Sequence, residues 1–139
     1  MKKTNIRAAV IGLGVGSYHV STYLKNKNSV LESVCDLEPK KINHIKKTFP
    51  KIAFSKNAKK IYQDKNINLV SVASYDNFHF EQIINLLNNN KNIFVEKPLC
   101  TNPDQLKKIF KLLKLKKKKL NCNFVLRGVS EFIQLKRII

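Results

Sequence analysis

Apolar residues along the chain occur in two patterns, short continuous runs and a repeat at helical spacing. Between six short apolar runs, apolar residues recur at helical spacing, as at Phe80, Ile83, Ile84 and Leu87. Strands that alternate with helices in this way predict right-handed crossovers. The pattern therefore indicates an α/β fold, a doubly wound parallel sheet of about six strands with flanking helices. The predicted strands are residues 6–11, 30–35, 52–54, 68–73, 92–95 and 120–125.

Proline, asparagine and threonine residues mark the ends of several predicted helices. Pro39 suits the first turn of a helix that Pro50 stops. Thr101 is expected to cap a later helix, and a last helix is expected to begin at Ser130. The inner face of the helix after Thr101 is expected to consist of Leu106, Ile109, Phe110 and Leu113.

Three of the four glycines, Gly12, Gly14 and Gly16, lie directly behind the first predicted strand. Glycines at this point allow a tight turn from strand to helix and let a phosphate approach the main chain. The spacing departs from G-x-G-x-x-G, because Ser17 stands where the third glycine is usual. Either the turn is one residue tighter, or Ser17 tolerates the close approach of the helix in place of glycine.

An acidic residue, Asp36, follows the second predicted strand, 20 residues after Gly16. A carboxylate at this position accepts a hydrogen bond from an adenosine ribose hydroxyl. The alternative is a loop residue or helix cap ahead of the next helix. A carboxylate also favours NAD over NADP because it repels a 2′-phosphate, although Lys40 and Lys41 nearby keep NADP open. Together the glycines and Asp36 predict a Rossmann dinucleotide-binding domain.

Composition narrows the class of protein. The chain has 139 residues, 43% hydrophobic and 26% charged, which suits one soluble globular domain with a real core. No apolar run approaches the ~20 residues of a membrane-spanning helix. A secretory leader that begins at Lys2 is disfavoured, because Arg7 and the glycines interrupt it. The scattered cysteines, Cys35, Cys100 and Cys122, indicate neither a disulfide framework nor a metal site and suit the cytoplasm.

The formal net charge of +18 suggests nucleic acid or an anionic surface as a partner. However, 24 of the 27 basic residues are lysines, whereas arginine is preferred for bidentate contacts with phosphate and guanine. The densest cluster, eight lysines between Lys107 and Lys119, lies at the end of a predicted helix, where cations complement the helix dipole. A solvated basic face is therefore favoured over a nucleic-acid site.

With these features the chain resembles the N-terminal domain of the Gfo/Idh/MocA family of NAD(P)-dependent oxidoreductases. The matching stretches are "GLGVGSYH", "VCDLEP", "VASYDNFHFEQI" and "NIFVEKPLCTN", of which "FVEKPL" is the most specific. The resemblance implies hydride transfer at a hydroxyl of a sugar, polyol or sugar nucleotide. It also implies that residues 1–127 form the NAD(P)-binding domain and that residues 128–139 begin the crossing to a substrate domain, which is absent from these 139 residues.

The resemblance implies roles for individual residues. Lys97 would lie beside the nicotinamide and help to move the proton of the substrate hydroxyl, and Pro98 would follow a cis bond. Glu96 would brace either this lysine or the cofactor. Ser74 would lie along the cofactor, and His79 matches a family histidine, with a packing role equally open. The expected cofactor-binding residues are Gly12, Gly14, Gly16, Ser17, Asp36, Ser74, His79, Glu96, Lys97 and Pro98.

Two rival functions stay open at this point. One is a truncated, non-catalytic module for nucleotide sensing or protein interaction, and the less favoured one is a basic nucleic-acid-binding protein. The expected partners are a nicotinamide dinucleotide and, in the intact enzyme, a small sugar-like substrate, with no membrane. Apolar surface on the last helix is expected to favour homo-oligomers.

Overall fold

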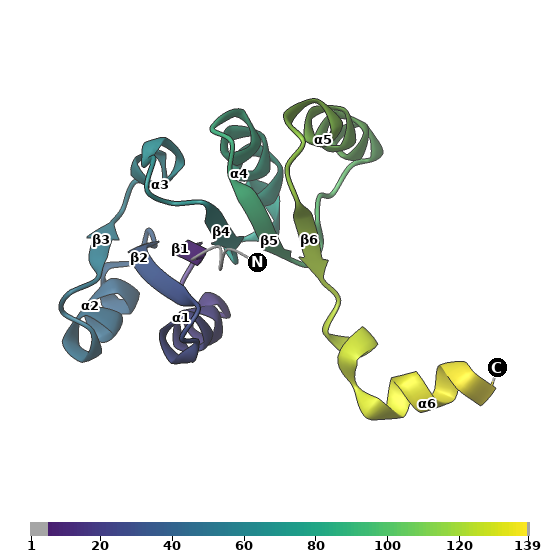
Figure 1. Ribbon diagram of the computed structural model, residues 1–139, viewed down its shortest axis with the longest axis horizontal. Coiled ribbons are helices and arrows are strands. Elements are labelled where there is room, and N and C mark those ends of the chain that lie inside the picture. Colours follow the sequence, from purple (N-terminus) through teal and green to yellow (C-terminus); the bar gives the residue numbers. More distant parts are fainter. Residues whose placement is uncertain (1–5, 139) are drawn as a thin grey trace.

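Six parallel strands form one sheet in the computed structural model, which describes residues 6–138 (Figure 1). Their order is β3-β2-β1-β4-β5-β6. The order reverses between β1 and β4, and ligands bind at this switch point in such sheets. The predicted doubly wound sheet is thus confirmed. The strands are β1 (Ile6–Ile11), β2 (Ser29–Cys35), β3 (Ala53–Ser55), β4 (Leu69–Val72), β5 (Asn92–Glu96) and β6 (Leu120–Asn123).

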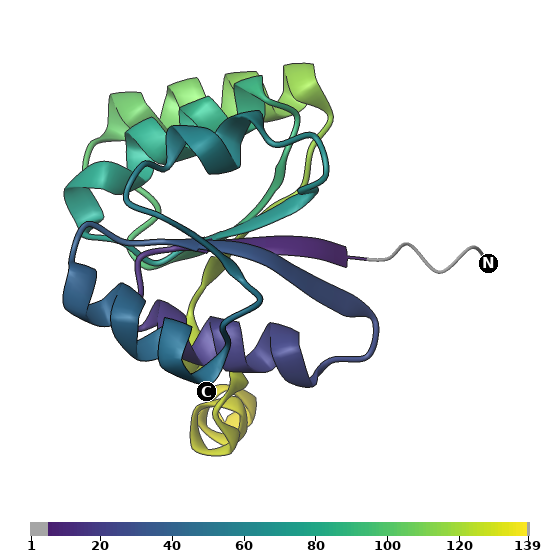
Figure 2. The same ribbon diagram turned by 90° about the vertical axis from the view of Figure 1, so that its left-hand side faces the viewer.

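Helices cover both faces of the sheet (Figure 2). One face carries α1 (Gly16–Lys25) and α2 (Pro39–Thr48), and the other carries α3 (Lys59–Gln63), α4 (Asp76–Asn88) and α5 (Pro103–Lys116). A 3₁₀ helix, η1 (Val125–Gly128), and α6 (Ser130–Ile138) follow β6. Within residues 6–138, no helix is both long and apolar enough to span a membrane. The segment from Lys2 in which a secretory leader was considered and disfavoured begins outside the described residues.

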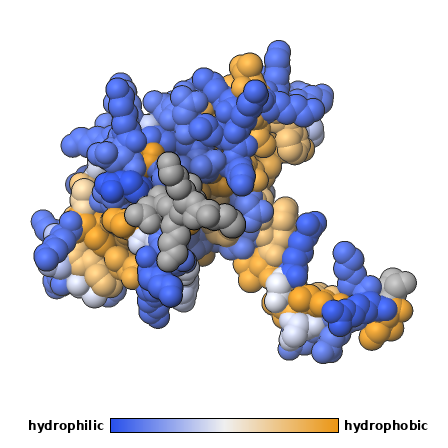
Figure 3. All heavy atoms as spheres, in the orientation of Figure 1, coloured by the Kyte–Doolittle hydropathy of each residue, from blue (hydrophilic) through white to orange (hydrophobic). Residues whose placement is uncertain are grey.

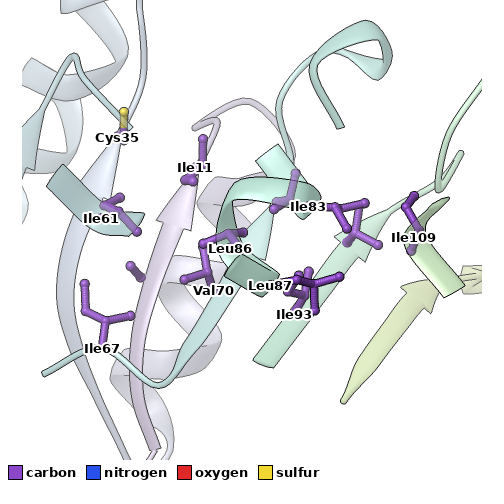
Figure 4. Close-up of a cluster of buried hydrophobic side chains, with 13 residues drawn as sticks. Ile11, Cys35, Ile61, Ile67, Val70, Ile83, Leu86, Leu87, Ile93 and Ile109 are labelled. Carbon is purple, nitrogen blue, oxygen red and sulfur yellow. The ribbon is translucent and has the colours of Figure 1, made fainter. Parts of the chain in front are cut away.

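The core has two parts because the strands bury side chains on both faces, as parallel strands do. In β1, Ala8 and Val10 pack toward α1 and α2, whereas Ala9 and Ile11 pack toward α3 and α4. Figure 4 shows the second part, where strand residues meet side chains of α3, α4 and α5. This double burial fixes the carboxyl ends of the central strands side by side.

Three local expectations were wrong in detail. Asn102, and not Thr101, caps α5, because its side-chain oxygen accepts a hydrogen bond from Asp104 N at 2.7 Å. Phe110 is 50% exposed, because α5 packs at the edge of the sheet and buries only a narrow stripe around Ile109. The last strand ends at Asn123, and the residues after Phe124 form η1.

The segment η1–α6 extends away from the sheet (Figure 1). Its surface combines apolar and charged side chains, and the apolar ones are visible in the space-filling view (Figure 3). The exposed apolar residues of this segment are Val125, Leu126, Phe132, Ile133, Leu135 and Ile138. An apolar surface of this kind supports the expected self-association, which stays a prediction.

Candidate functional site

A cavity of about 490 Å³ opens at the carboxyl ends of β1, β2 and β4. It lies at the switch point of the sheet, where the fold favours a ligand. Four of the expected site residues line it: Gly12, Gly14, Asp36 and Ser74. The cavity thus joins the glycine turn, the end of β2 and the loop after β4 in one place.

Each glycine of the turn has a different structural environment. Gly12 has φ +89°, and a Cβ there would lie 2.5 Å from Ser74 N and still closer to the carbonyl group of Ala73. A Cβ on Gly16 would lie 2.9 Å from Val10 Cγ1. A Cβ on Gly14 would meet no atom within 4 Å. Packing therefore requires glycine at position 12 and favours it at position 16, whereas the main chain at Gly14 is open for a ligand to approach.

The structure favours the tighter of the two turns considered from the sequence. Gly16 is the first residue of α1, and it makes the close approach to the sheet that the third glycine usually makes. Ser17 lies one residue further along, and its hydroxyl donates a hydrogen bond to Gly14 O at 2.8 Å. Ser17 thus steadies the turn and does not replace a glycine.

Asp36 holds the glycine turn against the end of β2. Its Oδ2 accepts a hydrogen bond from Leu13 N at 2.6 Å, and its Oδ1 accepts one from Glu38 N at 2.8 Å. It does not cap α2, whose N-cap residue is Glu38. Carboxylate oxygens accept more than one hydrogen bond, so Asp36 can brace the turn and still accept from a ribose hydroxyl in the cavity.

Apolar side chains also line the cavity and form an apolar wall, which sequence analysis did not find. Its residues come from three segments, the loop after β2, α3 with its N-cap residue, and α4, which only the tertiary fold brings together: Leu37, Ala58, Tyr62 and Phe78. Burial raises the pKa of Tyr62 to about 12 and, together with the Asp36 charge, the pKa of Cys35 to about 11. Both groups are therefore neutral at physiological pH, and the wall suits a flat, uncharged ring.

His79 is fully buried and does not line the cavity. Its Nδ1 lies 2.7 Å from Pro98 O, and its Nε2 lies 3.1 Å from Ser74 O. The imidazole therefore ties the loop after β4 to the loop after β5. These contacts favour the packing alternative, in which His79 positions the two loops, and direct contact with a cofactor stays a prediction.

Glu96 and Lys97 have separate surroundings. Glu96 Oε1 lies 2.9 Å from His19 Nε2 and accepts a hydrogen bond from Asn123 Nδ2 at 2.8 Å. Lys97 is exposed, and the bond to Pro98 is cis, as expected. Within residues 6–138, no ion pair joins Glu96 to Lys97. Successive residues of an extended chain point to opposite sides, which explains why Glu96 ties α1 to β5 and β6 instead of bracing Lys97.

The residues of the cavity fit a dinucleotide. The main chain of Gly14 is open in a position that a Cβ would occupy, and α1 begins directly behind it. The lining also includes the Asp36 carboxylate and the apolar wall. No group of three His, Cys, Asp or Glu side chains within the described part of the chain is suited to a metal ion.

Comparison with known proteins shows the family. Residues 6–124 match the sequence model of the Gfo/Idh/MocA family, described as an oxidoreductase family with an NAD-binding Rossmann fold. The chain belongs to this family. The resemblance inferred from the sequence and the nicotinamide cofactor that it implied, NAD, are confirmed by this match.

Individual relatives are similar over the same region. The chain is 29% identical over 98 residues to a myo-inositol 2-dehydrogenase of Thermotoga maritima, covering 70% of this chain and 29% of that protein. It is 29% identical over 113 residues to an uncharacterized oxidoreductase, YhhX, of Escherichia coli, covering 80% and 33%. The chain thus spans about a third of the length of these relatives.

Solved structures share the fold. The scyllo-inositol dehydrogenase of Lactobacillus casei superimposes with a TM-score of 0.88 at 22% identity, over 99% of this chain and 42% of that one. Its structure with bound NAD(H) and scyllo-inositol gives a TM-score of 0.85 at 22% identity, over 97% and 41%. A myo-inositol 2-dehydrogenase of Lactobacillus plantarum gives 0.88 at 25% identity, over 97% and 41%.

Proposed function

We propose that the chain is the dinucleotide-binding part of an oxidoreductase that acts on a hydroxyl of a polyol, sugar or sugar nucleotide. The observation that carries this proposal is the cavity between the open main chain at Gly14 and the carboxylate of Asp36. The inositol dehydrogenases among the relatives and solved structures support the substrate class. A bound nicotinamide would supply the carbon that accepts or donates the hydride.

The residues of the chain divide into three kinds of role in this proposal. Gly14 lets the pyrophosphate approach the N-terminus of α1, and Asp36 accepts a hydrogen bond from the adenosine ribose. The apolar wall contacts the planar base. Lys97, exposed after β5, donates a hydrogen bond to the substrate oxygen and helps to move its proton. His79 and Glu96 hold the loops that carry these groups.

Cofactor binding tests the core of the proposal. Calorimetric titration of the 139-residue chain with NADH is expected to give measurable binding, weakened by Asp36→Ala. Lys40→Met is the matched control, because Lys40 is exposed and does not line the cavity. Absence of both heat and a thermal shift at millimolar NADH contradicts the proposal.

Catalysis by this chain alone is expected to be absent. Holding the substrate carbon against the nicotinamide lowers a reaction barrier by ~7–11 kcal/mol. The residues that hold the substrate would belong to a substrate domain. Absorbance of NADH, followed with a panel of polyols and sugars, is therefore expected to show no turnover. An ordinary enzymatic rate that Lys97→Ala abolishes would contradict this expectation and show that these 139 residues form a complete active site.

The exposed apolar surface of η1–α6 favours a second candidate, a nucleotide-sensing or interaction module without catalysis. In that case NADH is expected to change the self-association of the chain in sedimentation experiments. Unchanged sedimentation with NADH bound would count against it.

We also propose a cytoplasmic location, which suits the free thiols of Cys35, Cys100 and Cys122.

A further inference from the structure

The charge at the walls of the cavity differs in sign from the charge of the chain. The chain has a formal net charge of +18. The cavity is lined by three carboxylates, Asp36, Glu38 and Glu81, and by two ammonium groups, Lys41 and Lys56. The walls thus have a formal excess of one negative charge. The long-range field attracts polyanions, whereas the local charges do not favour an additional phosphate at this point.

Glu38 contacts both Asp36, which holds the glycine turn, and Lys41 of α2. Its main-chain N–H donates a hydrogen bond to Asp36 Oδ1 at 2.8 Å, and its Oε1 lies 2.6 Å from Lys41 Nζ. Asp36 in turn accepts from Leu13 N at 2.6 Å. The hydrogen bond to Glu38, and to a smaller degree the charge of Asp36, raise the pKa of Lys41. Lys41 is therefore charged and already paired.

We infer that Glu38 contributes to the choice of cofactor, because its carboxylate pairs with Lys41, a cation of α2 that a 2′-phosphate could otherwise use at the end of β2. This inference rests on the proposed function, since it concerns the same cavity. The ribose hydroxyls of NAD need only an acceptor, which Asp36 provides. The phosphate of NADP would meet the carboxylate of Asp36 without a free cation from α2. Lys40, on the same helix, does not line the cavity.

The variant Glu38→Gln tests this directly. It keeps the shape of the side chain and the main-chain hydrogen bond to Asp36, but it removes one negative charge and so weakens the pairing that holds Lys41. Affinity for NADPH is expected to rise about three- to tenfold, as for a charge-assisted hydrogen bond near solvent. Affinity for NADH is expected to change less than about twofold. The gain is expected to shrink in 0.5 M salt, because the charges lie near the surface.

A double-mutant cycle shows whether Lys41 carries the effect. In a Lys41→Met background, Glu38→Gln is expected to leave NADPH affinity nearly unchanged, because no cation is released. Glu81→Gln is the matched control: it removes the same charge from the lining, and within residues 6–138 Glu81 forms no ion pair. It is expected to raise NADPH affinity less than Glu38→Gln does. Circular dichroism and a thermal midpoint check that each variant is folded.

The outcomes separate this inference from the proposed function. If the wild-type chain does not bind NADH, the proposed function fails. If the wild type binds NADH and Glu38→Gln leaves NADPH affinity unchanged, only the inference fails. It is also overturned if Glu81→Gln has an equal effect, which would show that net charge alone matters. A gain that persists with Lys41→Met but disappears with Lys56→Met would assign the role to Lys56 and overturn it as well.

Discussion

Replacing Gly12, Gly14 and Gly16 one at a time by alanine separates the folding of the turn from the binding of a ligand. In Gly12→Ala the residue keeps a left-handed conformation at φ +89°, which costs an L-residue ~1–2 kcal/mol. Its Cβ also displaces the main chain between Ala73 and Ser74, for which overpacking typically costs ~1–3 kcal/mol. The expected loss of about 2–5 kcal/mol is large against the ~5–15 kcal/mol that stabilises a domain.

The other two glycines are expected to behave differently. In Gly16→Ala the close atom is Val10 Cγ1, and the cost of moving it is offset in part by the ~1 kcal/mol by which alanine favours a helix over glycine. A net loss of ~0–2 kcal/mol follows. In Gly14→Ala the Cβ enters open space, so the free energy of unfolding is expected to stay within ~1 kcal/mol of wild type. Its NADH affinity is expected to fall about tenfold, which is ~1.4 kcal/mol.

Urea unfolding followed by circular dichroism, together with calorimetric titration of NADH, measures both effects in the same variants. With a slope of ~1–3 kcal/mol per molar urea, Gly12→Ala is expected to lower the midpoint by roughly 1 M or more. Gly14→Ala is expected to keep its midpoint and lose binding. The reasoning is refuted if Gly14→Ala unfolds as easily as Gly12→Ala, or if it remains folded and binds NADH like the wild type.

Three further predictions concern Lys91, His79 and the binding of DNA. Lys91 is buried at 4% exposure, and its Nζ donates to the carbonyl oxygens of Asp64 and Ile67, so Lys91→Met is expected to cost ~1–3 kcal/mol in urea unfolding. Burial lowers the pKa of Lys91 below 10.5, so its titration contributes stability that is present above the unfolded pKa and lost as pH falls through the folded pKa. The stability of wild type relative to Lys91→Met should thus rise as pH approaches 10.5, and a flat difference would contradict this. His79→Phe keeps a ring but removes the imidazole N–H that hydrogen-bonds a loop carbonyl oxygen, and a loss of ~1–3 kcal/mol is expected, against little change for the exposed control His44→Phe. Duplex DNA is expected to bind weakly and to dissociate with salt, and sequence-selective binding at about 200 mM salt would show a dedicated nucleic-acid site.

The sequence alone determined the class of fold and the place of the site. The alternation of apolar runs with helical spacing predicted the doubly wound sheet, because burial on both faces of a parallel sheet requires that pattern. Gly12, Gly14 and Asp36 were identified from their positions after β1 and β2, and they do line one cavity. These features depend on residues close in sequence, or on the ends of neighbouring strands, which the topology brings together.

Only the tertiary structure decided which contacts these residues make. The sequence kept two turns open, and the position of Gly16 against Val10 distinguished them. It assigned Glu96 to Lys97 or to the cofactor, whereas the fold placed Glu96 beside His19 of α1. The role inferred for Glu38 depends on its distance to Lys41 and on its place in the cavity wall, which only the fold defines. Such contacts join side chains from different elements at distances of a few ångströms, and the packing of helices on the sheet sets those distances, whereas the local pattern of apolar and polar residues does not.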